Sequence, residues 1–375
     1  MILSIGKNIL ICPLEWGLGH AGRMIPVAIK LKELGNKVFI GSGEEVQSMF
    51  RQETEGLSYI SFPGFKPRYS GILPQYLIML LKIPTLIISS YSEHRKLNEV
   101  ISQLNINIII SDNRFGLWNK RITSVYITHM PRIPFPDGTR FLEWIGIRLH
   151  RWVIRKYSFC LIPDLPGSLN LSGRLSHGIR LPGNTRYVGI LSRFAGRKYS
   201  GSNDKYQSPR TTLILSGPEP QKSIFRNRTI GLLRDRGTTT VILEGKPGKE
   251  AGDKVDGNLI SFSHLPSDEM RKVITGSELI ISRPGYTTLM ELLSIRQSAL
   301  VIPTPGQTEQ EYLAHYLSAK GWFKTIRQKD LKAGISISSG NPCEETSELL
   351  KESELLLDEA LEEILQHPDN QDHSK

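Results

Sequence analysis

The residues best suited to chemistry stand in a glycine-rich turn near the start of the chain. The apolar run ILIC is followed by Gly17, Gly19 and His20, and a helical pattern begins directly afterwards. Glycines permit positive φ and close backbone approach, and a helix start offers unpaired N–H groups and a positive dipole end to an anion. The imidazole of His20 can take a proton near neutral pH. The turn therefore predicts a base beside an anion site, with a structural, hydrogen-bonded histidine as the alternative.

A second group of polar residues follows two neighbouring apolar runs in the first half of the chain. Asp112, Asn113 and Arg114 come after the run 107–111, and His129 comes after the run 123–127. Because ligands bind outside the carboxyl ends of strands in open α/β sheets, these side chains should face the same cleft as His20. Asp112 is expected to orient His20 or to be the base itself. An Asx turn at a strand end is the alternative for Asp112.

A third group occupies residues 278–314, ELIISRPGYTTLMELLSIRQSALVIPTPGQTEQEYLA. This segment alternates strand, turn and helix twice. Helix-start N–H groups and hydroxyls suit phosphates there, and a carboxylate suits sugar hydroxyls. The segment therefore predicts a rim for a ligand with phosphates and a ribose. The candidate rim residues are Ser282, Arg283, Gly285, Thr287, Thr288, Glu291 and Thr304 to Gln310.

Short apolar runs alternate with longer helical patterns on both sides of a polar stretch at 196–209, which we interpret as a linker. This alternation is typical of parallel sheets covered by helices, so we predict two successive doubly wound α/β domains. The expected domains are 1–190 and 205–340, and an acidic, Leu-rich helix and tail occupies 341–375. The expected strands are 8–13, 37–41, 57–61, 107–111, 123–127 and 158–162, then 211–215, 239–243, 258–262, 278–282 and 299–302.

Charge and composition narrow the possible partners. Residues 1–190 hold 23 Lys and Arg against 12 Asp and Glu, whereas residues 191–375 hold 24 against 25. A basic half suits nucleic acid, an anionic membrane or an acidic substrate. The segment 139–156 places apolar residues at helical spacing, with its arginines largely on another face, which favours peripheral contact with an anionic membrane. A core-facing helix with a solvated basic face is the alternative.

Other features of the sequence exclude several classes. The three cysteines are widely spaced and form no CxxC pair, which favours neither disulfides nor a zinc cluster and suits a reducing compartment. No apolar run is long enough to cross a bilayer. No Asp-x-Asp metal motif occurs, and no recognition motif accompanies the basic half, so neither a metal nor nucleic acid is expected.

The glycine loop GLGHAGRMIPVA and the segment 278–314 resemble the UDP-N-acetylglucosamine transferases related to MurG, and the similarity covers roughly residues 8–30 and 187–325. The resemblance implies a GT-B fold, in which two Rossmann-like doubly wound domains face a cleft. It also implies an inverting, metal-independent sugar transfer without a cofactor, and a donor nucleotide held mainly by the second domain.

The resemblance assigns roles to individual residues. Glu291 matches the carboxylate that binds the ribose hydroxyls, and Gln310 matches the first of two glutamines that face the donor sugar. The second glutamine is Glu311 here, which bears on the identity of the sugar. Ser216 and Gly217 match the second glycine-rich loop, near the diphosphate. His20 matches a loop histidine on the acceptor side, Arg193 matches an arginine near the nucleotide, and His264 and Leu265 fall in the loop that touches the base.

The expected function is transfer of a sugar, N-acetylglucosamine first, from a UDP-sugar to a lipid-linked or cell-envelope glycan. His20 and Asp112 are the catalytic candidates, and Asn113, Arg114 and His129 lie on the acceptor side. Gly19, Arg283, Gly285 and Thr287 complete the donor side. The expected location is the cytoplasm, at the inner face of the cell membrane. The alternatives are a GT-B nucleotide-sugar epimerase or hydrolase, and a non-catalytic binder of nucleotide sugars or nucleic acid.

Overall fold

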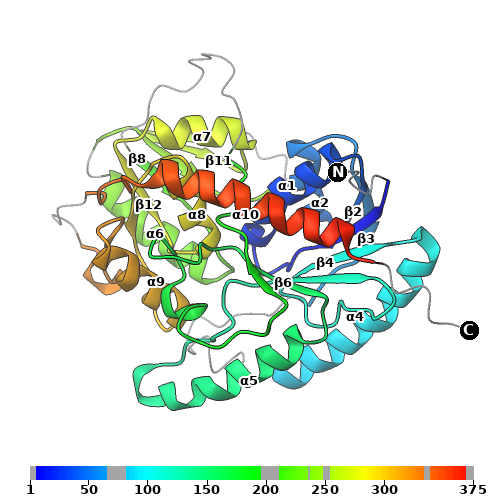
Figure 1. Cartoon of the computed structure of the whole chain (residues 1–375). Helices are drawn as coiled ribbons and strands as arrows, with labels where there is room; N and C mark the ends of the chain where they lie inside the picture. Colours follow the sequence, from blue (N-terminus) through cyan, green and yellow to red (C-terminus); the bar gives the residue numbers. More distant parts are fainter. Residues whose placement is uncertain are drawn as a thin grey trace, which may run out of the picture.

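The structure is a computed structural model that describes residues 6–65, 82–195, 211–234, 237–247, 254–332 and 338–368. It contains two seven-stranded sheets, each covered by helices (Figure 1). This arrangement confirms the prediction of two successive doubly wound α/β domains. The predicted linker at 196–209 lies outside the described residues.

The first sheet has the order β3-β2-β1-β4-β5-β6-β7, and all of its neighbouring strands are parallel. Its strands are β1 (Asn8–Cys12), β2 (Lys37–Ser42), β3 (Ser58–Ser61), β4 (Ile108–Asp112), β5 (Thr123–Ile127), β6 (Phe159–Ile162) and β7 (Thr185–Tyr187). The order reverses between β1 and β4, which opens a crevice at their carboxyl ends. His20 follows β1 and Asp112 ends β4, so the sheet brings both to this crevice.

The described helices of the first domain are α1 (Leu18–Glu33), α2 (Glu44–Glu53), α4 (Ile83–Leu104) and α5 (Glu143–Ile154), with short 3-10 turns η1 (Asp137–Leu142) and η2 (Gly173–Leu175). Gly17 has φ 146°, a backbone conformation that glycine adopts readily and L side chains rarely do. This glycine lets the chain turn from β1 into α1 and places His20 in the first turn of the helix.

The second sheet has the order β10-β11-β9-β8-β12-β13-β14, and only β10 runs antiparallel to its neighbour. Its strands are β8 (Thr211–Ile214), β9 (Thr240–Leu243), β10 (Lys254–Asp256), β11 (Leu259–Phe262), β12 (Leu279–Ser282), β13 (Leu300–Val301) and β14 (Lys324–Thr325). Its helices are α6 (Gln221–Arg234), α7 (Ser267–Thr275), α8 (Tyr286–Ser294) and α9 (Thr308–Ala319), with a 3-10 turn η3 (Gln328–Asp330).

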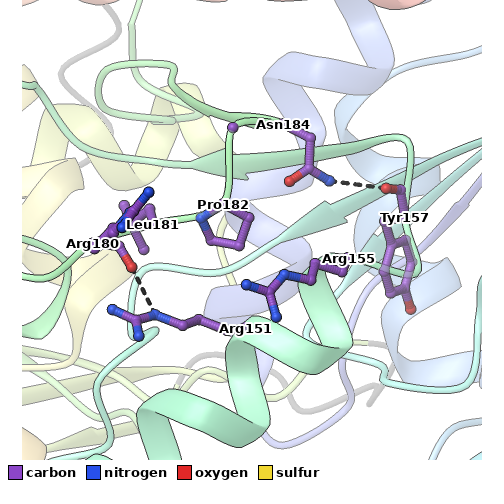
Figure 2. A pocket seen from close by; sticks show the side chains of 8 residues that line it. Arg151, Arg155, Tyr157, Arg180, Leu181, Pro182 and Asn184 are labelled. Atoms are coloured by element: carbon purple, nitrogen blue, oxygen red, sulfur yellow. Dashed lines mark hydrogen bonds between the residues drawn. The ribbon is translucent and has the colours of Figure 1, made fainter.

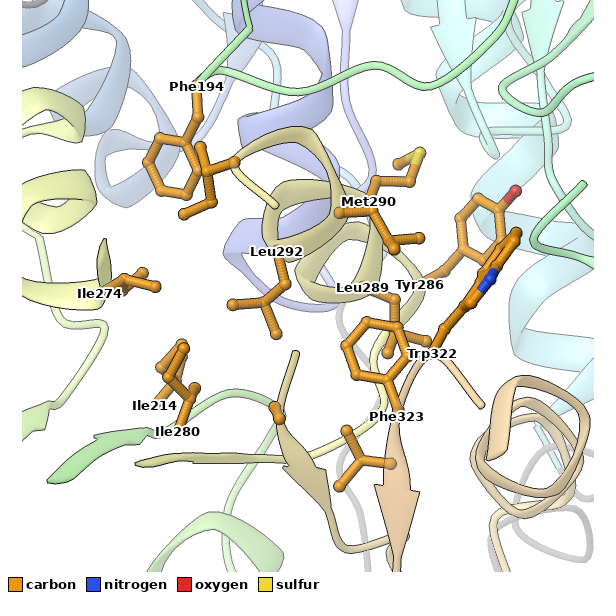
Figure 3. Packing of buried hydrophobic residues seen from close by; sticks show 14 of the residues in the cluster. Phe194, Ile214, Ile274, Ile280, Tyr286, Leu289, Met290, Leu292, Trp322 and Phe323 are labelled. Carbon is orange, nitrogen blue, oxygen red and sulfur yellow. The ribbon is translucent and has the colours of Figure 1, made fainter. Parts of the chain in front are cut away.

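The core of the second domain surrounds helix α8, which is buried on almost every side. Leu289 and Leu292 of α8 pack with Ile214, Ile280 and other strand residues (Figure 3). Phe194 follows the first sheet in sequence but belongs to this second core. The chain therefore enters the second domain's packing before its first strand begins.

The last helix, α10 (Thr346–Gln366), crosses from one domain to the other (Figure 1). Leu349, near its start, packs in the core of the second domain. Leu357, Leu361 and Ile364, further along, pack in the core of the first domain. The predicted acidic, Leu-rich terminal helix thus contributes to both cores with one amphipathic face.

Candidate active site

His20, Asp112 and Arg23 form a hydrogen-bonded group at the crevice between β1 and β4. His20 Nδ1 lies 2.9 Å from Asp112 Oδ2, and Arg23 Nε donates to the same oxygen at 3.0 Å. A terminal nitrogen of Arg23 also bonds to the second oxygen of Asp112. Asp112 is fully buried, whereas 19% of the His20 side chain stays exposed. The structure therefore places the two predicted catalytic residues in direct contact.

The charges in this group favour a neutral His20 beside an ionised Asp112. Burial alone would raise the pKa of Asp112, but Arg23 and His20 outweigh it and lower that pKa to about 2. Burial lowers the pKa of His20, and Arg23 adds to the lowering against the opposing effect of Asp112. His20 Nδ1 lies 2.9 Å from both Asp112 Oδ2 and Arg23 Nη2. In the tautomer with the proton on Nδ1, Asp112 accepts that proton and Nε2 keeps a free lone pair, as an orienting carboxylate arranges for a general base.

His129 joins this group to the second domain. Arg23 Nη1 donates to His129 Nδ1 at 3.1 Å, so the proton of the imidazole lies on Nε2, which is 2.9 Å from Glu309 Oε1. The ring of His129 stacks on Tyr286 of α8, with centroids 4.2 Å apart. Burial alone would raise the pKa of Glu309, but the hydrogen bond from His129 lowers it. The cleft is therefore spanned by one continuous chain of charged and hydrogen-bonded groups.

The other two acceptor-side candidates lie further from His20. Asn113 has φ 54° and its Oδ1 accepts the hydroxyl of Tyr126 at 3.1 Å. Arg114 is buried, with its bonds going to Phe62 O at 3.0 Å and to Glu93. Arg114 therefore ties the strands of the first sheet together, and the structure does not bring it into contact with His20 or Asp112.

Two predicted donor-side residues, Arg193 and Glu291, meet beside the N-terminal turns of α1, next to Gly22. Arg193 Nε donates to Glu291 Oε1 at 2.8 Å, and a second acid, Glu53 of α2, lies 3.9 Å from Arg193 Nη1. Burial raises the pKa of Glu291 against the opposing charge of Arg193. Among the described residues, none forms a hydrogen bond with the buried Arg193 Nη1 or with His264 Nε2 nearby. Buried donors of this kind normally have a partner, so they suit a bound polar ligand.

Helix α1 connects the two ends of the site through its glycines. A side-chain carbon at Gly19 would lie 3.2 Å from Thr287 Oγ1, and one at Gly22 would lie 3.2 Å from Glu291 Oε1. These glycines allow α8 of the second domain to approach α1 closely. The predicted base and the predicted ribose-binding carboxylate therefore lie on adjoining turns of one helix–helix contact.

The remaining predicted donor-side residues differ in how far they are exposed. Ser216 is partly exposed and Gly217 is exposed, with φ 89°, in the turn after β8. Leu265 is buried in the second core. Burial lowers the pKa of His264 to about 4, and Arg193 adds to the lowering. Gly285 immediately precedes α8 and forms its start.

Arg283, Gln310 and Glu311 have roles within the second domain. Arg283 is buried, donates to Ile302 O at 2.8 Å and covers the ring of Phe225, so it braces the sheet. Burial lowers the pKa of Arg283 to about 9. Gln310 accepts the N–H of Thr304 at 2.9 Å, and Glu311 accepts the N–H of Gly306 at 2.9 Å. These two bonds fix the turn that precedes α9.

Two residues of the site, Arg23 and Tyr286, were not predicted from the sequence. Glu309 lies within the predicted rim range Thr304 to Gln310, but its contact with His129 was not predicted. Arg23 lies three residues after His20, which puts both on one face of α1. Glu309 lies in the first turn of α9, next to the predicted Gln310. Among the described residues, no group of three or more His, Cys, Asp or Glu is arranged to hold a metal ion.

The chain is similar in sequence to known glycosyltransferases and glycosyltransferase domains. Residues 248–370 match the glycosyltransferase family 28 C-terminal domain. An uncharacterized glycosyltransferase from Methanosarcina mazei is 23% identical over 327 residues, which is 83% of this chain and 84% of that protein. A second, from Methanosarcina acetivorans, is 24% identical over 192 residues, 50% of this chain and 49% of that protein.

A UDP-N-acetylglucosamine--N-acetylmuramyl-(pentapeptide) pyrophosphoryl-undecaprenol N-acetylglucosamine transferase from Bacillus cytotoxicus is 41% identical over 165 residues, 41% of this chain and 44% of that enzyme. The matches thus cover about half the length of two of these three relatives.

Solved structures show the same fold. The glycotransferase of kitacinnamycin aligns with a TM-score of 0.60 at 13% identity, covering 96% of this chain and 93% of the other. The spinosyn rhamnosyltransferase SpnG complexed with thymidine diphosphate aligns with a TM-score of 0.55 at 14% identity, covering 95% and 91%. The chain has the predicted GT-B fold, and residues 248–370 in its second half match a glycosyltransferase domain.

Proposed function

We propose that this chain transfers a sugar from a UDP-sugar to a hydroxyl of a lipid-linked or cell-envelope glycan, with inversion at the anomeric carbon and without a metal. N-acetylglucosamine is the first candidate for the sugar, because the Bacillus cytotoxicus relative is named for that transfer. The observation that carries the proposal is the contact of His20 with Asp112. His20 lies on α1, and the same helix touches Thr287 and Glu291 of the donor domain.

The chemistry follows from the geometry of His20. The acceptor hydroxyl would give its proton to His20 Nε2 while its oxygen attacks the anomeric carbon and the bond to the diphosphate breaks. Asp112 stabilises the imidazolium that forms, because it is already ionised and 2.9 Å from Nδ1. Direct attack of this kind inverts the anomeric configuration.

The donor side would supply the binding of the nucleotide. Glu291 would bind the ribose hydroxyls, and Arg193 Nη1 would bind an oxygen of the nucleotide. The buried contact of Arg193 with Glu291 supports these roles. The diphosphate would lie against the turn of Ser216 and Gly217 and the start of α8, where backbone N–H groups and the helix dipole stabilise departing negative charge.

The test is a transfer assay with the full chain, UDP-N-acetylglucosamine and a polyprenyl-diphosphate-linked glycan. His20→Ala should lower kcat by about 10²–10⁴-fold and leave UDP affinity nearly unchanged. His315→Ala, on the exposed side of α9, is the matched control and should be fully active. Near-normal turnover of His20→Ala together with an inactive, folded Asp112→Ala would make Asp112 the base.

The same assay separates the alternatives. An epimerase or hydrolase would release a changed or free sugar without any acceptor, and a non-catalytic binder would give no product with any acceptor. Transfer with retention, measured by NMR on the product, would exclude the direct attack proposed here.

We also propose that the chain works at the inner face of the cell membrane, in peripheral contact through α4 and α5. Nine large apolar side chains on η1 and these two helices are exposed by between 44% and 72%. They are Ile83, Ile87, Ile88 and Tyr91 of α4 and Phe141, Trp144, Ile145, Leu149 and Trp152 of η1 and α5. The helices lie side by side (Figure 1), and His94 of α4 and Phe115 connect them through the 115–118 turn.

This exposure changes both predictions for residues 139–156, the core-facing helix and the helix with its arginines on a separate face. The core-facing alternative does not hold for the predicted apolar stripe, because Ile145, Leu149 and Trp152 are exposed. Another face of α5 does pack on the domain, since Val153 and Ile154 belong to a core cluster. The arginines do not occupy a separate face either, since Arg148 and Arg155 are exposed beside Trp152. No described helix is both long and apolar enough to cross a membrane. Apolar and basic side chains mixed on one solvent-facing side suit the membrane interface.

Vesicle co-sedimentation tests this contact. Trp144→Ser together with Ile87→Ser should reduce binding to anionic vesicles and leave UDP binding intact. Equal binding of the variant and the original chain, or no binding by either, would reject the membrane contact without affecting the assignment of sugar transfer.

A further inference from the structure

An open hollow of about 680 Å³ lies at the end of α5, away from the cleft. Tyr157, which precedes β6, and Gly183 and Asn184, which precede β7, line it. In a parallel sheet these positions lie at the amino ends of the strands, whereas Asp112 and His129 follow the carboxyl ends. The hollow is therefore on the opposite edge of the first sheet from His20.

Three arginines surround this hollow, which we call the arginine hollow. Arg151 and Arg155 lie on successive turns of α5, and Arg180 lies on the loop that faces them (Figure 2). Among the residues that the structure describes, no carboxylate lines the hollow. None of the three arginines forms an ion pair with another described residue. Like charges that share a hollow repel one another, and an anion bound between them would relieve that repulsion.

The hollow is held in shape by hydrogen bonds. Arg151 Nε donates to Arg180 O at 2.7 Å, which orients the guanidinium and leaves its two terminal nitrogens for other acceptors. Asn184 Nδ2 donates to Tyr157 O at 2.9 Å and to Ile154 O at 3.1 Å. The carbonyls at the end of α5 would otherwise disfavour an anion, and Asn184 satisfies two of them.

The chemistry of the hollow suits a phosphate group. Guanidinium groups match the spacing of phosphate oxygens with two parallel N–H donors, and three of them line this hollow. A carboxylate or sulfate offers fewer oxygens or a lower charge. The shared ligand chemistry is therefore a phosphate monoester, diester or diphosphate.

The neighbouring residues indicate where that phosphate comes from. At 100° per residue, Arg148, Trp152 and Arg155 fall within about 60° of one another around α5. Trp152 is 56% exposed, and Leu149 beside it is also 56% exposed. A soluble phosphate compound needs no exposed indole next to its site, whereas a lipid presents a phosphate and an apolar interface together.

We infer that the arginine hollow binds the phosphate of an anionic phospholipid head group, and so fixes which way α5 lies on the membrane. This inference rests on the membrane contact proposed above, but not on the sugar transfer. The apolar side chains supply insertion, and the arginine hollow supplies a specific head-group contact at the far end of the helix. The orientation that results keeps both ends of α5 at the surface.

The test compares Arg180→Gln with Arg148→Gln in co-sedimentation with phosphatidylglycerol and phosphatidylcholine vesicles. Both variants lose one charge, but Arg148 does not line the hollow. Loss of a diffuse surface charge weakens binding about 5-fold, whereas loss of hydrogen bonds to a charged group weakens it by roughly 10- to 150-fold. We expect the larger loss of vesicle binding for Arg180→Gln and the smaller loss for Arg148→Gln. Arg180→Lys should keep part of the binding, because lysine keeps the charge but lacks the paired N–H donors of the guanidinium.

Calorimetry with inorganic pyrophosphate forms the second arm. Saturable binding of pyrophosphate that is lost in Arg180→Gln, together with equal vesicle binding by all variants, would make the ligand a soluble phosphate and overturn the lipid assignment. Equal losses for Arg148→Gln and Arg180→Gln on vesicles would also overturn it, since only diffuse charge would then act. An unchanged urea unfolding midpoint shows that each variant is folded, and His20-dependent transfer is measured separately, so failure of the proposed enzyme activity does not bear on this result.

Discussion

Arg23 is the residue on which the arrangement of the cleft depends most, and replacing it with Met tests this directly. The guanidinium is 1% exposed and bonds to Asp112, His20 and His129. Met keeps much of the side-chain length but removes every one of these donors. Asp112 would then be a buried charge whose main counter-charge is gone.

The size of the effect can be bounded in two ways. Removing one partner of a buried ion pair costs about 3–5 kcal/mol. The pKa of Asp112 falls from 3.8 to about 2, and at 1.36 kcal/mol per unit this corresponds to about 2 kcal/mol after the opposing cost of burial. The value from the pKa is smaller because the unfavourable desolvation of Asp112 has already been subtracted from it. Arg23→Met should therefore lower the free energy of unfolding by about 3–5 kcal/mol.

The effect should depend on pH with a definite sign. In the original chain the pKa of Asp112 is depressed, so its stabilisation is present above pH 3.8 and is lost as the pH falls towards 2. Without Arg23, burial dominates and raises that pKa, so the ionised Asp112 destabilises the fold at neutral pH. The destabilisation by Arg23→Met should therefore be largest near pH 7–8 and should shrink as the pH falls towards 4.

Urea unfolding of four chains measures this: the original, Arg23→Met, Asp112→Asn and the double variant. The double variant should be more stable than the sum of the single losses by about 2 kcal/mol, because the neutral amide introduced by Asp112→Asn no longer needs a counter-charge. Arg186→Met is the control; Arg186 pairs with Glu363 at the surface, so its loss should cost at most about 1 kcal/mol. Additivity of the single variants within about 0.5 kcal/mol would refute the account of the buried pair.

Three further predictions concern the cleft and the packing. As the pH is lowered, the kcat/KM of the full chain should stay constant past pH 6.5 and fall only at more acidic pH, because the pKa of His20 is lowered and the base stays neutral. A fall in kcat/KM that begins at or above pH 6.5 would contradict a neutral base. Glu291→Ala should weaken UDP binding in calorimetry by about 1.5–3 kcal/mol, and an unchanged affinity would remove Glu291 from the ribose role. Gly189→Ala should destabilise by roughly 2–5 kcal/mol in urea, since Gly189 has φ 68° and its added carbon would lie 2.2 Å from Ser353 Cα. Gly231→Ala, in α6 with open space, is the control and should stabilise slightly; a Gly189→Ala protein as stable as this control would show that α10 does not pack there.

The sheets were largely predictable from the sequence because their central strands are short apolar runs bounded by polar turns. Ile108–Ile110 is such a run, and the structure buries it completely in β4. The edge strands β7, β10 and β14 were not predicted. Their residues are half-exposed or exposed, as in Thr185–Tyr187 and Lys254–Asp256, so no apolar run marks them. Pairing with a neighbouring strand, which is a tertiary contact, defines them.

The site was predictable only in part, for a related reason. His20 and Asp112 could be found because each follows a strand, and strand ends in a parallel sheet meet at one edge. From the sequence alone, Arg23 is expected to be a surface cation on a helix. Its partner Asp112 is 89 positions further along the chain, and only the fold brings the two together. Arg283 also follows a strand, but its side chain turns to Phe225, beneath the sheet. The direction of a side chain at a strand end depends on packing that the local pattern does not specify.

The path of helix α10 has a consequence for synthesis of the chain on the ribosome. The last strand of the first sheet, β7, is made long before Leu357, Leu361 and Ile364, which complete the core beneath that sheet. A nascent chain that has finished the first domain therefore carries an uncovered apolar groove while the entire second domain is translated. Such a groove is a binding surface for chaperones and a site of aggregation when translation stalls. Folding of the first domain is thus completed only after the second domain has been made.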